Sequence, residues 1–151
     1  MKPADTVQKI YRDFAIGDAA AILATFADDV EFRLAENHPY RDAAGPWRGK
    51  QAIAQNFFAV AGPEWEGWRM CVEQTVETAD AIVVEGRYKG LYKPTKRPMD
   101  VQVCHVWRFR GGEVASFHQY VDTAALRRVM VDGAAAARRS RCAQRTATKP
   151  A

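Results

Sequence analysis

The sequence lacks the features that mark several large classes of protein. It contains only 3 cysteines in 151 residues, an odd number without the paired spacing of a zinc site. This argues against a disulfide framework, and we expect free thiols. No run approaches the roughly 20 apolar residues of a membrane-spanning helix, and the N-terminal segment has no apolar stretch of a secretory signal. We therefore expect a cytoplasmic protein that does not enter a membrane.

Binding motifs for common cofactors are also missing from the sequence. We find no nucleotide, flavin, haem or metal motif, so no cofactor and no metal are expected. The paired glycines in "RGG", residues 110–112, follow a strand-like stretch. Such a pair is typical of a hairpin turn and does not make a phosphate loop.

Acidic residues are absent from the C-terminal end of the chain. Residues 133–151, "GAAAARRSRCAQRTATKPA", hold five Lys or Arg and no acid, which leaves 17 basic and 18 acidic residues in 1–132. We predict a single domain over 1–132 and a basic, disordered tail over 133–151. Because the domain is near neutral, the sequence gives no support for nucleic-acid binding by it. An arm that touches RNA or a membrane is the alternative for the tail.

Hydrophobic periodicity changes from helical to strand-like about halfway along the chain. Two helices are predicted first, since Val7, Ile10, Tyr11 and Phe14 share one helical face. A strand at 30–35 and a polar loop precede a third helix at about 53–61. From Trp65 onward the period becomes two, which predicts four strands and a closing helix, at about 66–78, 81–92, 98–110, 113–122 and 123–130.

Strand alternation predicts which side chains point into the domain. The inward set is mostly apolar and includes Met70, Val72, Val76, Ile82, Val84, Val101, Val103, Trp107 and Phe117. Three polar side chains fall within the same set: Tyr88, His105 and Gln119. The outer face of the predicted sheet is mixed, with Cys104, Val106 and Tyr120 among its members. A face of this kind without covering helices predicts a homodimer.

Three segments carry a family resemblance: "GDAAAILATFADDVEF", "WRGKQAI" and "HVWRFRGGEVASFHQYVD". With helices first and an antiparallel sheet after them, residues 5–130 resemble the nuclear transport factor 2-like superfamily. The resemblance is to its SnoaL-like branch, which is related to the ketosteroid isomerases. It implies an α+β fold in which a curved antiparallel sheet wraps around N-terminal helices. The resulting cone would enclose an apolar pocket.

The resemblance to ketosteroid isomerases implies a role for His105. Their oxyanion-stabilising acid lies at the position of His105, and a neutral imidazole can also donate a hydrogen bond. Their catalytic base corresponds to Leu34, and the tyrosine of their first helix falls near Ile10, one residue before Tyr11. These departures argue against steroid isomerisation by the same route.

The resemblance also extends to two other enzyme groups, the limonene epoxide hydrolases and the SnoaL-type polyketide cyclases. The paired aspartates and the arginine of limonene epoxide hydrolases would fall on Tyr88, Gln119 and Gly86. A phenol and an amide cannot replace two carboxylates in activating water, so we exclude epoxide hydrolysis. The SnoaL-type polyketide cyclases use an aspartate near the end of the last strand, a position that resembles Asp122.

These arguments yield a candidate site with two roles. His105 and Asp122 are the predicted catalytic residues. The predicted ligand-binding residues line the pocket or its mouth: Tyr88, Gln119, Trp47, Glu36, Phe32, Val103, Trp107 and Phe117. Structural alternatives remain for both catalytic candidates, because His105 could be a core histidine with one hydrogen bond and Asp122 could cap the helix that begins at Thr123.

Two function classes remain on sequence grounds. The first is a cofactor-independent isomerase or cyclase that acts on a small apolar carbonyl compound. The second is a non-catalytic module that binds a small apolar ligand or only dimerises. The lack of a clear inward carboxylate favours the second class. A partner-binding adaptor is a third possibility that rests only on the mixed outer face.

Overall fold

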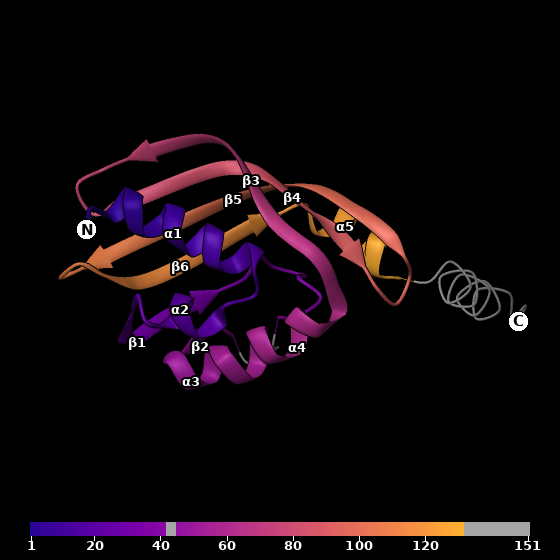
Figure 1. Ribbon diagram of the computed structural model, residues 1–151, viewed down its shortest axis with the longest axis horizontal. Helices are drawn as coiled ribbons and strands as arrows, with labels where there is room; N and C mark the ends of the chain where they lie inside the picture. Colours follow the sequence, from indigo (N-terminus) through magenta and orange to yellow (C-terminus); the bar gives the residue numbers. More distant parts are fainter. Residues whose placement is uncertain (42–44, 132–151) are drawn as a thin grey trace, which may run out of the picture.

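The computed structural model describes residues 1–41 and 45–131 (Figure 1). Two helices, α1 (Pro3–Ala15) and α2 (Ala19–Leu23), precede strands β1 (Phe26–Arg33) and β2 (Trp47–Arg48). A continuous helical stretch follows, made of α3 (Lys50–Ile53), η1 (Ala54–Phe58), α4 (Ala59–Ala61) and η2 (Gly62–Glu64). The second half comprises β3 (Trp65–Glu77), β4 (Ala81–Tyr92), β5 (Arg97–Arg110), β6 (Glu113–Val121) and α5 (Thr123–Met130).

The strands form one curved, open sheet in the order β2-β1-β6-β5-β4-β3. The long strands β3 to β6 are joined by hairpins and pair antiparallel. The predicted α+β class with a curved sheet and N-terminal helices is confirmed. One pairing differs from the predicted antiparallel sheet, because β1 runs parallel to β6. Strand β6 comes after β2, the helical stretch and strands β3 to β5, and it then lies beside β1 and runs in the same direction.

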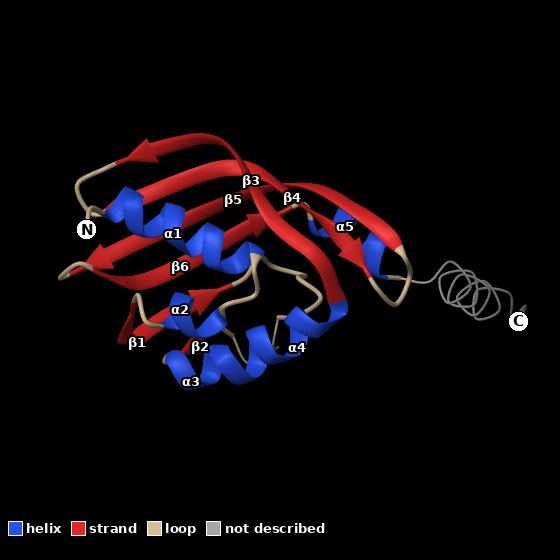
Figure 2. Cartoon of the chain, in the orientation of Figure 1, coloured by secondary structure: helices blue, strands red, loops and turns tan. Residues whose placement is uncertain are grey.

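The helices cover one face of the sheet (Figure 2). Pro3 starts α1, where its missing N–H is no loss, and Val7 and Ile10 on the apolar side of the helix are buried. Helix α1 packs against β3 and β4, and the stretch from α3 to α4 lies beside α2 at the β1 end of the sheet. The core therefore fills the space between the helices and the concave side of the sheet.

The structure corrects the predicted inward face of β3. Val72 and Val76 are 50% and 44% exposed, although alternation placed both inside. Val72 still pairs with the buried Gly86, so it stays on the inner face but is not covered. The pairing of β3 with β4 then shifts register between Val72 and Gln74, and such a bulge moves the following side chains, including Val76, to the other face. In addition, β1 begins at Phe26, four residues before the predicted strand, because Phe26 and Ala27 are already buried.

The predicted tail over 133–151 lies outside the described residues. Within the described ranges, no helix is both long enough and apolar enough to cross a membrane.

Candidate functional site

A buried histidine lies at the centre of a chain of hydrogen bonds. His105 on β5 is only 2% exposed, and each of its ring nitrogens contacts a tyrosine hydroxyl. The distance from Nε2 to the Tyr88 hydroxyl is 2.6 Å, and the distance from Nδ1 to the Tyr11 hydroxyl is 2.8 Å. His105 therefore has two hydrogen-bond partners, whereas the alternative of a core histidine assumed a single hydrogen bond.

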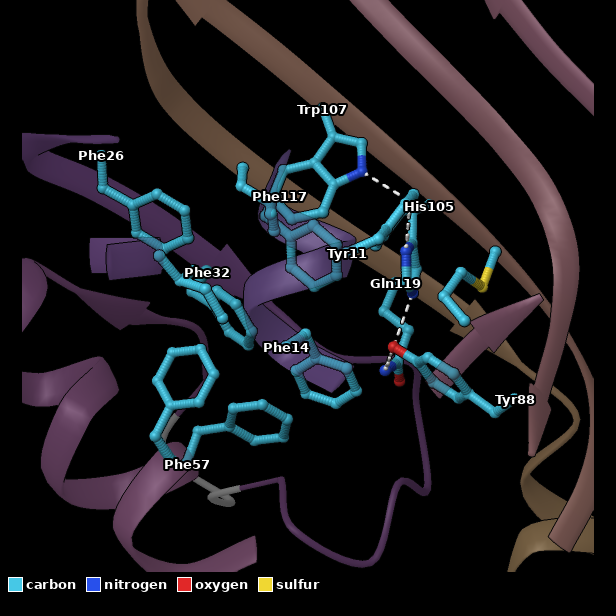
Figure 3. Close-up of a pocket in the computed structure, with 14 residues that line it drawn as sticks. Tyr11, Phe14, Phe26, Phe32, Phe57, Tyr88, His105, Trp107, Phe117 and Gln119 are labelled. Atoms are coloured by element: carbon cyan, nitrogen blue, oxygen red, sulfur yellow. Dashed lines mark hydrogen bonds between the residues drawn. The ribbon is translucent and has the colours of Figure 1, made fainter. Parts of the chain in front are cut away.

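The chain of hydrogen bonds continues beyond both tyrosines (Figure 3). Trp107 donates its indole N–H to the Tyr11 hydroxyl over 3.0 Å. Gln119, which has no exposed surface, donates an amide N–H to the Tyr88 hydroxyl, also over 3.0 Å. The other polar atom of that amide, Gln119 Oε1, is buried and has no hydrogen-bond partner among the described residues. We call these five residues the polar network.

Three neighbouring strands and one helix supply the polar network. His105 on β5 pairs with Gln119 on β6 and with Val84 on β4, so the inward side chains of the three strands lie side by side. Tyr88 is four residues after Val84, which keeps it on the same face of β4. Tyr11 comes from the apolar side of α1, next to the buried Ile10. The network thus joins the first helix to the centre of the sheet.

An aromatic cavity lies next to the polar network. Its free volume is about 30 Å³, and its walls are almost entirely apolar, formed by Ile10, Tyr11, Phe14, Ile22, Phe26, Phe32, Phe57, Phe58, Met70, Tyr88, His105, Trp107, Phe117 and Gln119. This volume is enough for about two water molecules, since one needs roughly 10–15 Å³ measured in this way. Any larger ligand must therefore displace aromatic side chains.

A second hollow adjoins the aromatic cavity. Its free volume is about 190 Å³, and it shares Phe14, Ile22 and Phe58 with the inner cavity. Trp68 lines this hollow, and within residues 1–41 and 45–131 its buried indole N–H has no hydrogen-bond partner. The ring of Phe14 lies 5.1 Å from that of Trp68 and 6.4 Å from that of Tyr88. Phe14 therefore contacts both the hollow and the polar network, and so does Trp68, whose ring lies 5.3 Å from that of Tyr88.

Burial keeps the polar network uncharged near neutral pH. It lowers the pKa of His105 to about 3, because an imidazolium would lose its hydration there. Burial also raises the pKa of the Tyr11 and Tyr88 hydroxyls, so neither forms a phenolate near neutrality. Among the described residues that line the cavity there is no Asp, Glu, Lys or Arg. The site can donate and accept hydrogen bonds, but it offers no base with a pKa near 7.

Six of the predicted site residues line the aromatic cavity: Phe32, Tyr88, His105, Trp107, Phe117 and Gln119. The other four do not. Trp47 packs behind the wall, with ring centroids 6.1 Å from those of Phe32 and Phe57. Glu36 is exposed in the loop after β1, and Val103 is buried in the sheet but outside the lining.

Asp122 serves as a helix cap in the structure. Its carboxylate accepts a hydrogen bond of 2.9 Å from the Ala125 N–H and begins α5. The residue lies along a groove on the outer face of the sheet together with Cys104 and Tyr120. Asp122 therefore lies apart from the cavity of His105, as the outward or rim position given by strand alternation implies, and its catalytic role stays a prediction.

The sequence interpretation missed Tyr11 and most of the helix-side wall as site residues. Tyr11 lies on the apolar side of the first predicted helix with Val7, Ile10 and Phe14, and this was the available signal. A tyrosine among three aliphatic or aromatic neighbours on a buried face needs a hydrogen-bond partner. That partner is 94 positions away along the chain, at His105.

Comparison with known proteins gives a family and many similar folds. Residues 7–117 match the family described as the SnoaL-like domain. A comparison with curated protein sequences gave no match. An NTF2-like protein from Burkholderia thailandensis is 29% identical, with a TM-score of 0.77 over 87% of this chain and 99% of that one.

Two other solved structures are similar in fold. IdmH, a proposed polyketide cyclase from Streptomyces antibioticus, is 19% identical and covers 86% of this chain and 99% of its own, with a TM-score of 0.72. TerC, crystallised with polyporic acid, is 22% identical and covers 83% and 95%, with a TM-score of 0.74. At these identities the likeness shows the fold alone.

Proposed function

The chain belongs to the SnoaL-like domain family, and on this basis we propose that it binds a small, neutral, largely apolar carbonyl compound. One observation carries the proposal: a buried network of Tyr11, His105, Tyr88 and Gln119 ends in an aromatic cavity. Small-molecule sites typically combine apolar walls with a few convergent polar groups in this way. The aromatic side chains would contact the body of the ligand, and the network would fix its oxygen.

The network favours a carbonyl oxygen over other polar groups. Tyrosine hydroxyls and an amide N–H are hydrogen-bond donors, and they lie where water does not compete. A hydrogen bond in such surroundings polarises a carbonyl more strongly than it does in water. The names of two proteins of the same fold, a proposed polyketide cyclase and a protein crystallised with polyporic acid, are in keeping with small organic ligands.

A second candidate function is a cofactor-independent isomerase or cyclase that acts on the same compound. It is supported by the donors themselves, since preorganised donors in a dry site stabilise the oxyanion of an enolate or an aldol transition state. Abstraction of a proton would need a base, and His105 is a poor one because both of its nitrogens are occupied and its pKa is low. The geometry therefore supports binding and polarisation better than proton transfer.

A thermal-shift screen followed by calorimetry tests this function. Neutral aromatic ketones and aldehydes should raise the melting temperature, because a ligand that binds only the folded state stabilises it. Since no group in the cavity titrates near neutrality, the affinity should be the same from pH 5.5 to 8. Carbonyl compounds that leave the melting temperature unchanged at millimolar concentration would contradict the proposal. An affinity that changes about tenfold per pH unit would favour the base-dependent enzyme.

A further inference from the structure

We propose that Gln119 is the specificity-determining residue of the cavity and selects neutral ligands that carry a hydrogen-bond donor beside an acceptor. Such ligands include carboxamides and hydroxy-substituted enones. This inference rests on the proposed function, because it assumes that a ligand enters the cavity. It adds the class of polar group that the ligand presents.

The polar network has more N–H and O–H hydrogens than hydrogen bonds. Trp107 and the neutral His105 each supply one N–H, Tyr11 and Tyr88 each supply one O–H, and Gln119 supplies two N–H groups. Four hydrogen bonds join these five residues, and each uses one hydrogen. Two of the six hydrogens are therefore unused. One belongs to the Gln119 amide, and the other belongs to Tyr11 or Tyr88, depending on the tautomer of His105.

The second step concerns the oxygen of the same amide. Gln119 Oε1 has no hydrogen-bond partner in the described part of the chain, and the side chain has no exposed surface on which water could supply one. Buried polar atoms in proteins are nearly always hydrogen-bonded, and each exception needs an explanation. Gln119 lines the cavity, so a ligand there could supply the missing donor. The amide thus has both an unused acceptor and an unused donor.

The third step concerns the charge of the ligand. The described cavity lining contains no Lys or Arg, and His105 stays neutral through burial. A carboxylate or a phenolate would lose its hydration on entry and would gain no counter-ion. The cavity therefore excludes anions. A ligand that satisfies the Gln119 amide must bring its donor and its acceptor as uncharged groups.

Three probes of nearly the same shape separate these features. Benzamide carries a donor beside an acceptor, acetophenone carries the acceptor alone, and benzoate is the anion. Their dissociation constants should be measured by calorimetry at pH 7 for the wild type and for Gln119→Met, which keeps the length of the side chain and removes its amide. Met70→Leu is the matched control, since Met70 lines the same cavity with an apolar side chain.

The comparison of wild type with Gln119→Met cancels the different hydration of the probes. We expect the affinity ratio of benzamide to acetophenone to fall at least fivefold in Gln119→Met and to stay within twofold in Met70→Leu. Benzoate should bind neither protein measurably. If the ratio is the same in all three proteins, or if benzoate binds as tightly as benzamide, the inference fails.

Failure of this inference is distinguishable from failure of the proposed function. The hydrocarbon analogue α-methylstyrene and acetophenone should still bind to the wild type if only the role of Gln119 is mistaken. If no probe binds, including the hydrocarbon, the cavity is not a ligand site and the proposed function falls with the inference. Circular dichroism and urea denaturation of Gln119→Met establish that the variant is folded. If Gln119→Met does not fold, the same affinity ratio is measured for Gln119→Leu, and the binding of benzoate to the wild type at pH 7 tests the exclusion of anions.

Discussion

The Nε2 atom of His105 and the hydroxyl oxygen of Tyr88 lie 2.6 Å apart between the neighbouring strands β5 and β4. Both side chains are at most 4% exposed. Because the other ring nitrogen of His105 reaches Tyr11 on α1, one imidazole ties the first helix to the middle of the sheet. The same side chains line the cavity, so the network serves the fold and the site together.

Replacing His105 with Phe should destabilise the protein while keeping its fold. The ring volume is roughly conserved, but the buried hydroxyls of Tyr11 and Tyr88 each lose one of their two partners, at a cost of about 1–3 kcal/mol. Urea denaturation measures this difference. His118→Phe is the matched control, because His118 lies on the next strand with its side chain partly exposed and should change stability little. Equal stability of wild type and His105→Phe would show that the two hydrogen bonds contribute nothing.

Acid should destabilise the protein through its buried histidines. The pKa of His105 is about 3 in the folded state, against an ordinary value near 6.5. The unfolded state therefore binds more protons between these values, and stability falls as the pH is lowered through this window. From pH 7 to pH 5 the loss from His105 should be about 2 kcal/mol. His38, whose pKa burial lowers to about 4, acts in the same direction.

The variant His105→Phe isolates the contribution of this histidine to the pH dependence. Urea denaturation at pH 7 and pH 5 should show a smaller drop for the variant than for the wild type, by about 2 kcal/mol. Few carboxylates titrate in this interval, so histidines dominate the difference. Identical drops for the two proteins would mean that His105 is accessible enough to be protonated in the folded state.

Replacing Phe14 with Ala should open the inner cavity to larger ligands. The ring of Phe14 lines both the 30 Å³ cavity and the 190 Å³ hollow, and its removal should join the two. We expect a stability loss of about 2–4 kcal/mol and a tighter binding of two-ring ketones by about tenfold. Calorimetry and urea denaturation measure both effects. Phe109→Ala is the control, since this partly buried ring lines neither space; an equal gain in that variant would refute the gating role.

We further propose that the protein forms a homodimer through the outer face of its sheet. Tyr120 is 51% exposed there, and a groove along this face includes Tyr120 and Cys104. An apolar surface of this kind is commonly covered by a partner. Light scattering at tens of micromolar should give twice the monomer mass, and Tyr120→Lys should give the monomer. A wild-type monomer at this concentration would end the proposal.

Local patterns in the sequence predicted the sheet side of the site. Strand alternation needs only neighbouring residues, so it placed Tyr88, His105 and Gln119 on one face, and the structure brings them together. It failed for Val76 because a bulge in β3 depends on how β3 meets β4. It could not give the bond between Tyr11 and His105, which depends on where α1 docks.

For other residues, the position in the sequence is compatible with two different roles. From the sequence, Asp122 could be either a catalytic residue or a helix cap. Only the structure shows that its carboxylate accepts a hydrogen bond from the Ala125 N–H. Trp47 was placed at the pocket mouth, but it packs behind Phe32 because β2 pairs with β1 at that position. The family resemblance supplied the overall fold, whereas the hydrogen-bond partners of His105 came only from the structure.

We propose above all that the polar network anchors a neutral carbonyl ligand in the aromatic cavity. The most direct test compares the dissociation constants of acetophenone and α-methylstyrene, which differ in C=O against C=CH₂, for the wild type and for the double variant Tyr11→Phe/Tyr88→Phe. The hydrocarbon reports whether the cavity remains intact in each protein. We predict that the affinity ratio of ketone to hydrocarbon is about two- to tenfold higher for the wild type than for the double variant, because one net hydrogen bond contributes this much. An equal ratio in the two proteins would show that the tyrosine hydroxyls do not hold the carbonyl oxygen.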